Sequence, residues 1–179
     1  VNEGSEALTY LWFDIGLETP VVWVGRWFSL LELSEYEKAA SWIGVTPFGP
    51  FKQSLSSYVS YRQSPTTEGA VQLVDNIMTA QQKGLPPWLA FFMLDQINES
   101  DAALQILAEQ ASQGYFDNSV VLFYPSRGDT RKSEQYYDYL ESLGHVSFWQ
   151  VAGPPDICED EPNLHFCLRI IEDPSNGYP

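Results

Sequence analysis

The chain has 179 residues, 44% of them hydrophobic and 15% aromatic, which is enough for a packed core and excludes a chain that is disordered throughout. Its 24 acidic residues outnumber its 9 basic residues and give a formal net charge of −15. Such a surface repels phosphates, so it argues against direct binding to nucleic acid or anionic membranes and fits a basic protein partner. A requirement for solubility alone explains the same charge equally well.

The length fits a single domain, which we expect to span residues 1–173, followed by a frayed tail at 174–179. Two cysteines, Cys158 and Cys167, are too few for a disulfide framework, so we expect free thiols and a cytoplasmic protein. A single disulfide between the two is the alternative. No stretch has the pattern of a signal peptide or the apolar length of a membrane span. The sequence begins at Val1 and not at a methionine, so a longer precursor is an alternative that the sequence leaves undecided.

The first half of the chain predicts a mixture of strands and helices. In chain order these are a strand at 7–16, a strand at 20–28, a helix at 33–44, a short polar strand or loop at 54–62, and a helix at 70–83. The two strands are rich in β-branched and aromatic residues. Ser34 and Glu37 have the spacing of a capping box for the first helix, and Gly84 ends the second.

The second half predicts more buried strands. In chain order these are a strand at 89–94, a helix at 99–114, a strand at 119–124, a helix at 129–144, a strand at 145–151 and a last strand at 164–171. The run Leu89–Leu94 is unbroken and apolar, which suits a strand buried on both faces, although a helix also fits so short a run. Ser100 is the predicted cap of one helix, and Asp129 or Thr130 that of the next.

Strands that alternate with helices across short connections are typical of right-handed crossovers onto a parallel sheet. We therefore expect an α/β fold, a layered domain with a central mixed, partly parallel sheet flanked by about four helices. In such a fold, ligands gather at the carboxyl ends of the strands, where Arg127 follows the strand at 119–124. Arg127 could hold an anion there, but neither nucleotide-binding glycine motif is present, and a capped turn explains the segment better.

Residues that favour partner binding are large aromatic, arginine and exposed acidic side chains, since aromatic and arginine residues are enriched at binding hot spots. Our candidates for partner contacts are Trp23, Trp27, Arg127, Asp156, Glu159, Asp160 and Glu161. For such contacts we expect Trp27 or Arg127 to lie exposed. Cys158, His165 and Cys167 match no standard zinc spacing, and we expect no metal, no cofactor and no catalytic residue.

Several local patterns resemble the DUF4123 domain, whose members act as adaptor chaperones for type VI secretion effectors. "LTYLWFDIGLE" resembles the opening strand of that family through Tyr10 and Asp14, and "TPFGPFKQSL" resembles its Gly-Pro segment through Gly49 and Pro50. "WLAFFMLDQINESDAALQILAEQ" followed by "VVLFYPSR" resembles its strand, helix and strand. The family's Asp before Pro is absent here, since Tyr124 precedes Pro125 directly. The resemblance implies an adaptor function.

Two classes of function follow. The leading hypothesis is a non-enzymatic, acidic protein-binding module in the form of an adaptor chaperone, with an immunity protein or DNA-mimic inhibitor of a basic partner as its nearest rival. The other class is a small α/β enzyme that binds an anionic ligand at the strand ends near Arg127, which only the expected architecture supports.

Overall fold

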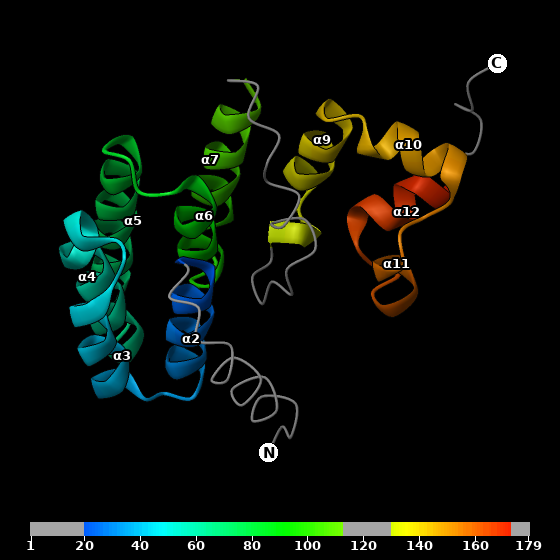
Figure 1. Cartoon of the computed structure of the whole chain (residues 1–179). Coiled ribbons are helices and arrows are strands. Elements are labelled where there is room, and N and C mark those ends of the chain that lie inside the picture. Colours follow the sequence, from blue (N-terminus) through cyan, green and yellow to red (C-terminus); the bar gives the residue numbers. More distant parts are fainter. Residues whose placement is uncertain (1–19, 113–129, 173–179) are drawn as a thin grey trace. The chain divides into compact units, whose positions relative to one another are not determined.

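The computed structural model describes residues 20–112 and 130–172, and every regular element in these two ranges is a helix (Figure 1). The chain divides into two compact units, an N-terminal unit, Val1–Leu85, and a C-terminal unit, Pro86–Pro179. No strand occurs in the described ranges, so the predicted α/β fold with a central sheet is wrong, and the described fold is all-α. The strands expected at 7–16 and 119–124 and the tail at 174–179 lie outside the described residues.

The helices of the N-terminal unit run as follows: α2 Pro20–Glu32, α3 Tyr36–Trp42, α4 Lys52–Gln63 and α5 Thr67–Gln82, with short 3₁₀ turns η1 Ile43–Val45 and η2 Gly49–Phe51. Those of the C-terminal unit are α6 Pro87–Asp95, α7 Ser100–Ser112, η3 Thr130–Lys132, α9 Glu134–Ser142, α10 His145–Ala152, α11 Ile157–Asp160 and α12 His165–Glu172. The helices predicted at 33–44, 70–83, 99–114 and 129–144 are thus confirmed where they are described, although α5 begins three residues earlier than predicted.

The segment predicted as a strand at 20–28 is helical because its large side chains repeat every four residues. Trp23, Trp27 and Leu31 are all buried, and this spacing places them on one side of a helix. Pro20 is the first residue of α2, where a missing N–H costs nothing. The large side chains of this segment do not alternate as those of a strand do, because they follow the period of a helix.

The same correction applies to the other predicted strands that are described, at 89–94, 145–151 and 164–171, and to the strand or loop at 54–62. Pro87 opens α6 as Pro20 opens α2, and Leu89–Asp95 are all buried, so a helix hidden on every side produced the apolar run. In the last predicted strand, Leu164, which precedes α12, and Cys167 and Ile170 within it are buried and recur every three residues.

Aromatic stacking fills the core of the N-terminal unit. The Trp27 ring lies 5.5 Å from both Trp23 and Tyr58 and 5.3 Å from Phe28, measured between ring centroids. Phe48 meets Trp23 edge-on at 5.7 Å. These residues come from α2, α4 and the loop before η2, so the stack joins segments that are distant in sequence.

Helix ends differ in part from the predicted caps. Ser34 adopts a left-handed conformation with φ 59° and does not cap α3, which begins at Tyr36. The cap of α9 is Ser133, whose Oγ accepts a hydrogen bond from the Tyr136 N–H at 3.2 Å, so neither Asp129 nor Thr130 has that role. Gly84 and Gly144 have positive φ at helix ends, as their positions predicted.

Candidate functional site

An open groove of about 700 Å³ lies between α7 and α9 in the C-terminal unit. Its lining residues from α7 are Asp101, Leu104, Gln105, Ala108, Ala111 and Ser112, and those from α9 are Gln135, Asp138, Tyr139, Ser142 and Leu143. Within each helix these residues recur at intervals of three and four, so each set forms one continuous face. The groove is thus built from two helix faces that turn toward each other.

The groove has an apolar floor and a polar rim. Leu104 and Tyr139 are 7% and 8% exposed and form the floor, and burial raises the pKa of the Tyr139 hydroxyl, which therefore stays neutral. Ala108, Ala111 and Leu143 add apolar walls with small side chains on the α7 side. Covering such a surface with the apolar side chains of a partner removes it from water and lowers the free energy.

The charge at the groove is entirely negative among its described lining residues. Asp101 and Asp138 are exposed at the rim, and neither carboxylate has a hydrogen bond or an ion pair with any described residue. The remaining polar lining residues are glutamines and serines. The rim can therefore accept hydrogen bonds from a cation without first breaking an internal pair.

The basic residues nearby in the sequence are occupied elsewhere in the same unit. Arg131 is 6% exposed, and its Nη2 lies 3.4 Å from an oxygen of Glu161. Arg169 pairs with Glu134 at 3.8 Å, and its guanidinium lies 5.8 Å from the centre of the Tyr137 ring. Neither arginine lines the groove, so neither neutralises its rim by direct contact.

A polar cluster around η3 holds the C-terminal unit together beside the groove. The Thr130 hydroxyl, which is fully buried, donates to Ser100 Oγ at 3.0 Å and so joins η3 to the start of α7. Arg131 and Asp95, both buried, act electrostatically on Tyr136, whose pKa is raised chiefly by burial. Because Tyr136 lies in α9 and Asp95 ends α6, this electrostatic interaction links α9 with the buried helix α6.

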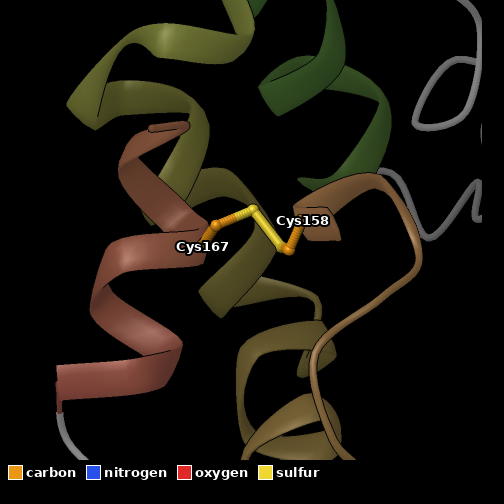
Figure 2. The surroundings of a disulfide bond; sticks show 2 residues. All are labelled: Cys158 and Cys167. Carbon is orange, nitrogen blue, oxygen red and sulfur yellow. A yellow bond between two sulfur atoms is a disulfide. The ribbon is translucent and has the colours of Figure 1, made fainter. Parts of the chain in front are cut away.

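A disulfide between Cys158 and Cys167 ties α11 to α12, as Figure 2 shows. The two Cα atoms lie 5.5 Å apart, and both cysteines are buried. The expectation of free thiols is therefore wrong, and the bridge that the sequence left open is present. The paired sulfurs are also unavailable as metal ligands, and no group of three or more His, Cys, Asp or Glu in the described ranges is placed to hold a metal ion.

The tryptophans predicted to contact a partner lie in the core of the N-terminal unit. Trp23 is 5% exposed and Trp27 is 0% exposed, so the expectation that Trp27 lies on the surface is wrong. Their large side chains pack against one another because α2 has a helical period, whereas a strand would have separated them onto two faces. Arg127 lies outside the described residues.

The predicted acidic residues lie at α11 and are on the surface. Asp156, Glu159 and Asp160 are exposed, whereas Glu161 is 45% exposed and paired with Arg131. The structure does not bring these four residues into the α7–α9 groove. The strand-end cleft that supported the enzyme hypothesis has no counterpart in the described ranges, because the sheet itself is absent there.

Sequence reasoning missed the groove. It placed Leu104 inward, and it placed Tyr136, Leu140 and Leu143 on one stripe of the following helix, but it did not consider the adjacent face of either helix. The sequence did contain one sign of a groove, the small apolar residues Ala108 and Ala111. They lie one turn and two turns beyond Leu104 on the same helix face. Which helix lies opposite that face depends on tertiary structure alone.

Comparison of the chain with protein-family models, with curated proteins and with solved structures finds no match in any of the three. None of the helices in residues 20–112 or 130–172 combines the length and apolar character that a membrane crossing requires.

Proposed function

We propose that this chain is a non-enzymatic protein-binding module whose C-terminal unit receives a partner with a basic surface. The observation that carries the proposal is the division of charge between the units. The sequence of the N-terminal unit, Val1–Leu85, contains nine acidic and five basic residues, whereas that of the C-terminal unit, Pro86–Pro179, contains 15 acidic and four basic residues. A requirement for solubility alone does not explain why the C-terminal unit carries 11 of the 15 excess negative charges.

This division supports steering of a cationic partner toward one unit. A surface dominated by one sign of charge accelerates encounter with the opposite sign, and salt weakens the effect. The described arginines of the C-terminal unit each pair with a glutamate of the same unit, Arg131 with Glu161 and Arg169 with Glu134, so these pairs leave the net charge of the unit unchanged.

An adaptor chaperone for a secreted effector is the specific form of the proposal that the DUF4123 resemblance suggests. That form now rests on the sequence motifs alone. Leu89–Leu94, where the resemblance implies a strand, is part of α6, and two of the quoted segments, 8–18 and 120–127, lie outside the described residues.

The cellular location is likewise a proposal. Free thiols were the reason to expect the cytoplasm, and a buried disulfide instead favours an oxidising compartment. A basic protein encountered in that compartment is then the expected partner.

The test begins with capture of proteins from the native host by the full chain at low salt, followed by elution with a salt gradient. The captured partner is then titrated against two triple variants that raise the net charge equally. The first, Asp156→Asn/Glu159→Gln/Asp160→Asn, neutralises exposed acids of the C-terminal unit. The second, Glu37→Gln/Glu68→Gln/Asp75→Asn, neutralises exposed acids of the N-terminal unit and serves as the matched control.

We expect the first variant to weaken binding about tenfold at low salt and the control to weaken it about twofold or less, because salt screens surface charges beyond about one Debye length and the nearer acids therefore contribute most. Equal effects of the two variants would overturn the assignment to the C-terminal unit. Failure to capture any partner with a basic surface would overturn the proposal as a whole.

A further inference from the structure

We propose that the groove between α7 and α9 is the docking site for a basic amphipathic helix of the partner. This inference rests on the proposed function and deepens it by naming the site and the class of ligand. The occupant is one helical segment with apolar residues at helical spacing on one face and lysine or arginine beside them.

The shape of the groove fits a helix. Two helix faces that turn toward each other leave a trough into which the side chains of a third helix can insert, which is a recurring mode of peptide recognition. The nine residues of α9 extend about 13 Å at 1.5 Å per residue, which corresponds to two or three turns of a bound helix. In the described ranges no strand edge is present onto which an extended peptide could add.

The floor of the groove supplies the apolar contact. Leu104 and Tyr139 lie at its base, and Ala108 and Ala111 keep the α7 wall low enough for the backbone of another helix to approach. Anchors at positions i, i+3 or i+4, and i+7 of the bound helix would cover these residues.

The rim selects the charge of the occupant. The carboxylates of Asp101 and Asp138 belong to opposite walls, one on α7 and one on α9. Lysine or arginine side chains that flank an apolar stripe can therefore reach an acceptor on either side. An acidic helix would meet these carboxylates with no basic lining residue to compensate, so the groove rejects it.

The probe for the test is a synthetic peptide of about 14 residues, long enough for four helical turns, with leucine at helical spacing and lysine on the flanks. Its controls are a peptide of the same composition in scrambled order and a peptide with glutamate in place of each lysine. Binding to the full chain is measured by calorimetry at low and at moderate salt.

Two alanine substitutions on the protein form a matched pair. Ala108→Arg places a bulky cation in the groove, and Ala152→Arg makes the same change at an exposed alanine of α10, outside the groove lining. Ala152 follows Phe148 and Val151, which are 63% and 68% exposed, so the second variant also tests the exposed apolar surface of α10. Circular dichroism checks that both variants keep their helices.

We expect Ala108→Arg to weaken binding of the lysine–leucine peptide at least tenfold and Ala152→Arg to change it less than twofold. Equal binding of the scrambled peptide would overturn the inference, because the charge of the peptide would then be enough for binding without an apolar helix face. A larger loss in Ala152→Arg would overturn it by placing the peptide on α10. A change of oligomeric state in Ala108→Arg, seen by sedimentation, would overturn it by assigning the groove to a second copy of the chain.

The failure of this inference is distinguishable from failure of the proposed function. If the partner captured from the host binds Ala108→Arg as tightly as the unmodified chain and still responds to neutralisation of the C-terminal acids, the groove assignment fails alone. If binding responds to neither change, both fail.

Discussion

The N-terminal unit buries its aromatic side chains against one another, whereas the C-terminal unit joins its helices through specific polar and covalent links. Trp27 contacts three other aromatic rings, and the net charge of its unit is only −4. In the C-terminal unit, the Cys158–Cys167 bridge joins residues with a sequence separation of 9, and the Arg131–Glu161 pair joins residues 30 apart.

The difference has a physical cause. The C-terminal unit carries a large excess of negative charge, which opposes compaction through self-repulsion. Its helices after residue 130 are at most nine residues long, and helices of that length are marginal without tertiary support. Cross-links offset both costs, so the unit can present an acidic surface and remain folded. The N-terminal unit, which has a smaller net charge of −4 and longer helices, is held by apolar burial.

The largest expected effect tests the aromatic core. Trp27→Ala should lower the free energy of unfolding of the N-terminal unit by about 3–5 kcal/mol, because it removes a fully buried indole and leaves a cavity among its neighbouring rings. Denaturant unfolding followed by circular dichroism measures the loss. Val45→Ala, at a residue 68% exposed, is the control and should change little. A loss below about 1 kcal/mol in Trp27→Ala would contradict the comparison.

Removal of the disulfide tests the covalent link in the C-terminal unit. The double variant Cys158→Ala/Cys167→Ala should lose about 2–3 kcal/mol, because the bridge closes a loop with a sequence separation of 9 and restricts the unfolded chain. Thermal unfolding with and without a reducing agent measures the effect. The reductant should destabilise the unmodified chain and leave the double variant unchanged, and equal sensitivity of the two would show that the bridge contributes nothing.

Removal of one partner of the half-buried ion pair should have a smaller effect. Glu161→Gln should cost about 1–2 kcal/mol, since Arg131 is 7% exposed at its side chain and loses a charged acceptor, although Glu161 itself is 45% exposed. Glu134→Gln, which breaks the Arg169 pair at 3.8 Å between two exposed side chains, is the matched control and should cost less than about 0.5 kcal/mol. Chemical denaturation distinguishes the two, and equal losses would remove the distinction between buried and exposed pairs.

The smallest expected effect is a dependence on pH at α10. His145 stacks on Trp149 with ring centroids 5.4 Å apart, and burial lowers the pKa of its imidazole. The unfolded chain therefore binds this proton more readily, so the stability from His145 is present above its ordinary pKa of about 6.5 and declines as the pH falls below it. The melting temperature should drop by no more than about 2 °C between neutral pH and the lowered pKa. His145→Gln should abolish that component, and an unchanged pH profile in the variant would exclude His145 as its source.

Local sequence signals predicted the helices that carry clear start and stop residues. Gly84 and Gly144 marked helix ends correctly, and the stripe with Tyr136 and Leu140 is buried as expected. These features depend on neighbours within one or two turns, so the sequence contains them directly. Even there, Ser133 replaced the expected cap of α9, because several capping residues stand side by side.

Short apolar runs were misassigned for a different reason. A run such as Leu89–Leu94 has no polar face, so a helix buried on all sides and a strand between two layers produce the same pattern. The proline that opens α6 and the four-residue recurrence from Trp23 to Trp27 and Leu31 were the only local evidence for helix. The candidate groove could not be predicted at all, because it depends on which face of α7 meets α9.

The three-residue turn η3 has a consequence for the order in which the chain folds. Thr130 reaches back 30 residues to Ser100, and Arg131 reaches forward 30 residues to Glu161. Contacts of such range form slowly, and during synthesis the second of them cannot form until Glu161 has left the ribosome. The helix α6, which is apolar except for Asp95 at its end, is made long before that point. The interval between the synthesis of α6 and that of Glu161 is therefore the stage at which the nascent chain is most exposed to aggregation.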